Sequence, residues 1–140
     1  MKNLNWIIIL VILTGCSRGI ELRPISLAPL FNDSNSKIWI VDEVNSGNKN
    51  FAPKINVEKD VVIFYKNGKC VFQPMKTIGD IEGKRGEYSL YSDEKSISLF
   101  FANERWEFKI DVQSQDKIVL TPTEKSDIKY QLVIIPFPEI

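Results

Sequence analysis

Short apolar runs recur along the chain from Lys37 onward, and residues that favour turns separate them. The runs lie about 8 to 12 residues apart, which is the spacing typical of an antiparallel all-β domain. No stretch shows helical spacing long enough to compete with this pattern. About eight strands are predicted, at Lys37–Val44, Asp60–Tyr65, Cys70–Gln73, Glu87–Tyr91, Ser96–Phe101, Trp106–Val112, Lys117–Thr121 and Ile128–Ile135.

The dipeptide Asn67-Gly68 is the strongest hairpin signal, because both central positions of a type I′ turn favour a positive φ. A two-residue turn there predicts that Ile63 pairs with Phe72 and Tyr65 with Cys70. Four-residue loops at Ser92–Lys95 and Ala102–Arg105 would carry the same apolar face into the following strands. The expected pairs across them are Leu90 with Ile97, Tyr88 with Leu99, Phe101 with Trp106, Leu99 with Phe108, and Ile97 with Ile110.

Strands that follow one another through tight loops form a meander, and about eight strands is the number at which such a meander closes. We therefore predict an all-β fold, a small antiparallel up-and-down barrel. A sandwich would need longer crossovers, and only Asn45–Lys59 and Pro74–Gly86 exceed hairpin length. The runs 61–65 and 132–135 are apolar on both faces, which indicates cover from the preceding segment or from a partner.

The start of the chain has the features of a secretory leader. Met1-Lys2-Asn3 carries a positive charge, and an apolar run extends from Trp6 to Leu13. A helix that spans a membrane needs about 20 apolar residues, so this run is too short for one. The pattern predicts a signal peptide.

The run ends in Leu13-Thr14-Gly15-Cys16, which resembles the lipobox of bacterial lipoproteins. The resemblance implies that the Cys16 sulfur carries diacylglycerol and that its new amino terminus receives a fatty acid such as palmitate. Several acyl chains, at about 0.8 kcal/mol per buried CH₂, would make a stable membrane anchor. Ser17 is not the aspartate associated with inner-membrane retention in enterobacteria, so we expect an envelope protein of the outer membrane.

These patterns divide the chain into three predicted segments. Residues 1–15 are the predicted signal peptide, residues 16–36 the lipidated Cys16 and a tether, and residues 37–140 the barrel domain. The tether is inferred from two prolines and the polar cluster at residues 32–36. A flexible tether of this length would hold the domain on the order of 25 Å from the bilayer.

Composition excludes several functions. The chain has 18 Lys and Arg against 18 Asp and Glu, which gives no electrostatic case for nucleic acid. It has no histidine, so Ser–His and Cys–His nucleophile pairs and histidine-ligated metal sites are excluded. We expect no enzyme, no metal and no cofactor. Cys70 would be the only thiol left after lipidation of Cys16, and we expect it to be a small buried hydrophobe.

The barrel region also resembles the lipocalin-like lipoprotein domains of Bacteroidota. The residues that match are Trp39, Phe64-Tyr65-Lys66-Asn67-Gly68, Gly86-Glu87-Tyr88-Ser89-Leu90, Trp106-x-Phe108 and Lys117-Ile-Val-Leu120. The resemblance covers nearly the whole mature domain, and it implies a barrel in an envelope lipoprotein.

Two functions remain open at this point. The barrel could bind a small hydrophobic ligand at an open mouth, with Asn45–Lys59 and Pro74–Gly86 as rim loops. The candidate ligand-binding residues are Ile63, Phe72, Tyr88, Leu99, Phe101, Trp106 and Phe108. Alternatively these side chains fill the barrel completely, and the protein is an interaction or inhibitor module that binds an envelope protein through its outer face or loops.

Overall fold

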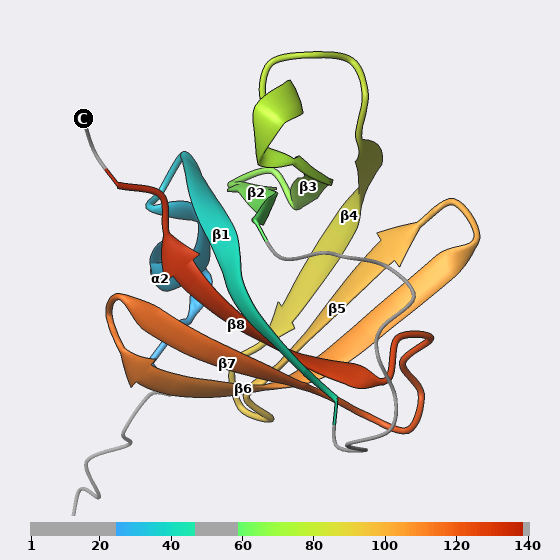
Figure 1. Ribbon diagram of the computed structural model, residues 1–140. Coiled ribbons are helices and arrows are strands. Elements are labelled where there is room, and N and C mark those ends of the chain that lie inside the picture. The colour runs from blue at the N-terminus through green and yellow to red at the C-terminus, as the bar shows by residue number, and fades with distance from the viewer. Residues whose placement is uncertain (1–24, 47–58, 139–140) are drawn as a thin grey trace, which may run out of the picture.

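The computed structural model describes residues 25–46 and 59–138. Eight strands form one closed antiparallel barrel in the order β1 to β8, so that each strand pairs with its sequence neighbour and β8 pairs with β1. The strands are β1 (Ser36–Ser46), β2 (Asp60–Tyr65), β3 (Lys69–Pro74), β4 (Lys84–Tyr91), β5 (Ser96–Phe101), β6 (Glu104–Ser114), β7 (Lys117–Pro122) and β8 (Tyr130–Pro136). The predicted fold class is confirmed (Figure 1).

The register predicted for the β2–β3 hairpin is wrong by one residue. Phe64 pairs with Cys70, because the turn holds three residues instead of two. The Gly68 N–H donates to the Tyr65 carbonyl at 3.1 Å, and Gly68 has φ +81°, as in a type I turn followed by a left-handed glycine. A shift of one residue exchanges the two faces of a strand. Phe64 therefore points into the barrel, and Ile63 points outward.

The next two hairpins keep the predicted face. Leu90 pairs with Ile97 across the β4–β5 turn, as expected. The β5–β6 turn is tighter than predicted, so that Leu99 pairs with Trp106 instead of with Phe108. A shift of two residues leaves every side chain on its original face, so the same apolar residues still point inward.

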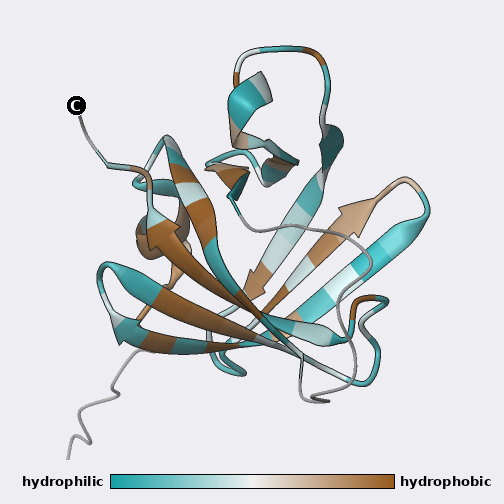
Figure 2. Ribbon diagram, viewed as in Figure 1, coloured by the Kyte–Doolittle hydropathy of each residue, from teal (hydrophilic) through white to brown (hydrophobic). Residues whose placement is uncertain are grey.

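The interior is packed with side chains from all eight strands. Inward positions alternate with outward ones, and the hydrophobic residues of the strands contrast with the largely hydrophilic turns (Figure 2). The buried core consists mainly of Trp39, Val41, Val62, Phe64, Cys70, Phe72, Tyr88, Ile97, Leu99, Phe101, Trp106, Phe108, Ile110, Ile118, Leu120, Tyr130, Leu132 and Ile134.

A short helix, α2 (Ala28–Asn32), lies in the second half of the predicted tether. Pro29 suits the first turn of a helix, and the helix ends at Asp33, which has a left-handed φ of 48°. Phe31 is fully buried against the Phe64 ring, with centroids 5.3 Å apart at 90°. Residues 27–32 thus pack on the barrel, and α2 covers one end of it (Figure 1).

The two ends of the barrel differ because the strands alternate in direction. The odd-numbered strands begin at the end covered by α2, which we call the closed end. The even-numbered strands begin at the opposite end, at Asp60, Lys84, Glu104 and Tyr130. We call this opposite end the mouth.

Two residues that point outward from the barrel, Val61 and Val133, are nevertheless buried, with 0% and 3% of their surface exposed. Helix α2 packs on residues that point inward, so its contacts are with other side chains.

Gly86 in β4 allows a close approach of β5. A Cβ atom at this position would lie 2.2 Å from the Phe100 carbonyl oxygen. We expect Gly86→Ala to lower the free energy of unfolding by about 2 kcal/mol, as overpacking does elsewhere, in urea titrations followed by circular dichroism. The partly exposed Ser89→Ala on the same strand is the control, with a change below about 0.5 kcal/mol. Equal midpoints for the two variants would contradict the steric argument.

Candidate functional site

A pocket of about 410 Å³ opens at the mouth of the barrel. Its wall combines aromatic rings from three strands with charged groups at the strand ends. The residues that matter for its chemistry are Phe72 at the end of β3, Trp106 and Tyr130 at the starts of β6 and β8, Asp60 at the start of β2, and Glu82 and Lys84 around the start of β4. We call this the mouth pocket.

Trp106 is the centre of the aromatic wall. Its ring meets Phe72 edge-on with centroids 5.0 Å apart and Phe101 with centroids 4.8 Å apart. Such edge-to-face pairs favour a fixed ring geometry. The Trp106 side chain is therefore held between two neighbouring rings at the inner wall of the mouth pocket.

Polar contacts at the mouth connect the Trp106 ring to the charged rim. The indole Nε1–H donates to a Glu104 carboxylate oxygen at 2.9 Å. The Lys84 ammonium donates to both oxygens of Glu104 at 3.0 Å and lies 5.4 Å from the Trp106 ring centroid. Lys84 thus contacts a carboxylate and an aromatic ring at the same time.

Two carboxylates influence the Tyr130 hydroxyl in the mouth pocket. Partial burial raises the pKa of the Asp60 carboxyl above its ordinary value. Burial also raises the pKa of the Tyr130 hydroxyl, and the negative charges of Glu104 and Asp60 raise it further. Both carboxylates therefore act on the same inner side chain of the pocket.

The structure divides the predicted ligand-binding residues among different places. Phe72 and Trp106 line the mouth pocket, and Phe101 packs behind Trp106. Leu99 and Phe108 are buried in the core beneath them. Tyr88 is buried toward the closed end, and Ile63 points outward, so the structure brings neither of them to the mouth. Sequence patterns did not predict four further residues of the mouth, Asp60, Lys84, Glu104 and Tyr130. Their common signal is that each stands at the start of an even-numbered strand.

The closed end is held together by hydrogen bonds that link α2 to the strands. The Trp39 indole donates to the Phe31 carbonyl at 3.1 Å. The Asn32 amide donates to the Tyr88 hydroxyl at 3.1 Å, and this hydroxyl donates to the Tyr65 carbonyl at 2.8 Å. These contacts close the barrel end around α2.

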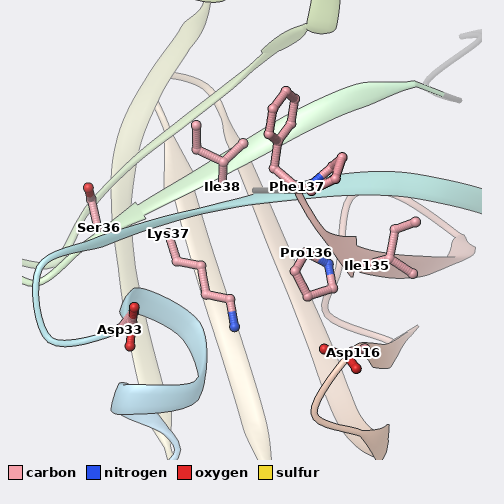
Figure 3. A pocket seen from close by; sticks show the side chains of 9 residues that line it. Asp33, Ser36, Lys37, Ile38, Asp116, Ile135, Pro136 and Phe137 are labelled. Carbon is pink, nitrogen blue, oxygen red and sulfur yellow. The ribbon is translucent and has the colours of Figure 1, made fainter. Parts of the chain in front are cut away.

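A second, larger groove of about 710 Å³ lies outside the barrel near the closed end. Figure 3 shows Ile38 and Phe137 on one side of the paired strands, and Lys37 pointing away from them between Asp33 and Asp116. The Lys37 ammonium lies 4.4 Å from the Trp39 ring centroid. Ile38, Ile135 and Phe137 are half-buried and give the groove an apolar floor.

Cys70 is a free cysteine with 1% of its surface exposed, so the prediction of a small buried hydrophobe is confirmed. Burial, with a smaller effect of Glu87, raises the pKa of its thiol to about 12. Residues 25–46 and 59–138 contain no group of three or more potential metal ligands. Within the same ranges no helix is long and apolar enough to span a membrane. Cys16 lies outside them.

The Cys70 thiol should react with alkylating reagents only after unfolding. At pH 8 a pKa near 12 leaves about one thiol in ten thousand ionised, against about one in ten for an ordinary cysteine. The raised pKa also predicts stability that is complete below about pH 9 and is lost as the pH rises toward 12. Urea titrations between pH 8 and 11 should show a steeper loss for the wild type than for Cys70→Ala. Equal slopes, or rapid alkylation of the native protein, would contradict this.

The fold and the site together define a small closed β-barrel with α2 over one end and a pocket at the other, an arrangement consistent with a lipocalin-like fold. No protein-family model matches the chain, and no curated protein or solved structure is significantly similar to it.

Proposed function

We propose that this protein is a lipid-anchored envelope protein that binds a small hydrophobic ligand in the mouth pocket. The observation that supports this best is the pocket itself, an opening of about 410 Å³ walled by Phe72, Trp106 and Tyr130. Ligand sites usually have volumes of about 300 to 1,000 Å³ and combine apolar walls with a few polar groups. Binding rather than catalysis is proposed, because the chain has no histidine to act as a general base.

The lipid anchor is proposed from the sequence, and the position of α2 gives it a geometric consequence. Nine peptide steps separate Cys16 from Ile25, which limits the distance between these residues to about 30 Å. Ile25 precedes α2 at the closed end. Anchoring through Cys16 would therefore hold the closed end nearer to the membrane and leave the mouth accessible from the other side.

Ligand binding can be measured with the neutral fluorescent probe N-phenyl-1-naphthylamine. We expect the mature chain with Cys16→Ser, which cannot be lipidated, to enhance its fluorescence. Trp106→Leu should weaken binding about tenfold, because it removes the aromatic wall that the probe would contact. Tyr91→Ala is the matched control, since Tyr91 is an aromatic residue exposed on the barrel surface. Equal affinities for both variants would place the probe outside the mouth.

Membrane anchoring should depend on Cys16 and not on Cys70. We expect wild type and Cys70→Ala to sediment with membranes and Cys16→Ser to stay in the soluble fraction, because acyl chains supply the membrane affinity. Intact mass measurement should show the added lipid only when Cys16 is present. A membrane-bound Cys16→Ser variant without added mass would refute lipidation as the anchor.

The outer groove supports a second candidate function, binding of an envelope protein. Its half-buried floor of Ile38, Ile135 and Phe137 is the apolar surface that carries this alternative. Trp39 and Phe64 do not line this groove, since both are buried in the core. Absence of probe binding at the mouth would favour this second function.

A further inference from the structure

The described residues of the mouth pocket include more carboxylates than ammonium groups. Asp60 and Glu82 line it, and Glu104 reaches it through its ion pair with Lys84. Among the described residues that line the pocket or pair with a lining residue, three carboxylates accompany one ammonium. Charge of one sign around an apolar cavity selects ligands of the opposite sign.

Lys84 shows how the mouth pocket holds a cation. Its ammonium is bound by the Glu104 carboxylate and lies over the Trp106 ring, 5.4 Å from the centroid. Neighbouring rings fix Trp106, and the Glu104 carboxylate accepts its indole N–H. An aromatic face attracts ammonium groups, and a neighbouring carboxylate adds the attraction of opposite charges.

We propose that the mouth pocket binds an apolar molecule that carries an ammonium group, and that this ammonium takes the place of Lys84 over Trp106. The inference specifies the chemical class of the ligand and rests on the function proposed above. The apolar part of such a molecule would contact Phe72 and Tyr130, which line the pocket next to Trp106.

The exchange of Lys84 for a ligand is physically easy. The side chains of Lys84 and Glu104 are 44% and 41% exposed, and exposed ion pairs contribute little to stability. A lysine ammonium is strongly hydrated, so release of Lys84 into water compensates for its lost contacts. A quaternary ammonium has no N–H groups to hydrate and gains more from the aromatic wall.

An anionic ligand fits the same geometry poorly. Its charged group would have to compete with Glu104 for Lys84, which already donates to both oxygens of that carboxylate. It would also lie near Asp60 and Glu82, which carry charge of the same sign. The proposal therefore predicts an order of affinity that depends on ligand charge.

Three water-soluble probes that share one benzene ring test this order: benzyltrimethylammonium, benzyl alcohol and benzoate. They are titrated into the purified full chain, labelled with ¹⁵N, while the indole N–H signal of Trp106 is followed by NMR and assigned with Trp106→Phe. We expect the ammonium probe to shift this signal with a Kd at least about tenfold below those of the other two.

Two charge variants locate the effect. Glu104→Gln should weaken binding of the ammonium probe about tenfold and leave benzyl alcohol unchanged, whereas Lys84→Met should strengthen ammonium binding because it frees Glu104 and Trp106. Glu94→Gln, which changes an exposed carboxylate in the β4–β5 turn at the closed end, is the matched control and should have no effect. The spectrum of each variant also reports whether it is folded.

The outcomes separate the two proposals. If benzyl alcohol binds at Trp106 as tightly as the ammonium probe, the charge preference is wrong while ligand binding at the mouth stands. If no probe shifts the Trp106 signal in the wild type or in Lys84→Met, both proposals fail. Tighter binding of benzoate than of the ammonium probe would overturn the inference and favour an anionic ligand.

Discussion

The pairing of β1 with β8 is the constraint on which the rest of the structure depends. It extends from Trp39–Pro136 to Ser46–Tyr130 and converts a meander with two free edges into a closed barrel. A register shift between Val41 and Glu43 interrupts it, and such bulges help a sheet to curl. Closure gives the inward side chains only two exits to solvent. The chain enters β1 from one end, and α2 covers that end. Among the described residues, the other end is lined by side chains, those of the mouth pocket.

The two ends satisfy their buried polar atoms in different ways. At the closed end, Trp39 and Tyr88 donate to the backbone carbonyls of Phe31 and Tyr65, which cannot leave without moving the main chain. At the mouth, Trp106 donates to a side chain that is itself paired with an exposed lysine. Hydrogen bonds to backbone groups fix α2 to the strands, whereas side-chain partners at the rim can be exchanged. The closed end therefore acts as a structural base, and the mouth is where the proposed ligand would bind.

The sequence predicts the architecture well because a β-barrel follows from alternation and turn spacing. The strands Asp60–Tyr65 and Ser96–Phe101 are predicted with the bounds that the structure has. The register of a hairpin is harder to predict, since one extra residue in the turn that ends at Gly68 exchanges the two faces of β2 and points Ile63 out of the barrel. The residues of the candidate site are harder still to predict. Phe72 and Trp106 stand out as aromatic residues on an inward face, but the importance of Lys84 and Glu104 arises only when β4 and β6 bring their first residues to the same end. No local sequence pattern predicts that Lys84 and Glu104 lie in contact.

The proposed anchor and the proposed ligand are linked through the geometry of the barrel. A lipid on Cys16 would keep the closed end close to the bilayer, because Ile25 is only nine residues away. A ligand would then reach the mouth from water and not from the membrane interior. Such a ligand must be soluble enough to arrive and apolar enough to remain among Phe72, Trp106 and Tyr130. An ammonium group on an apolar body meets both conditions, since the charge provides solubility and the rim carboxylates with Trp106 recover its interaction energy in the bound state.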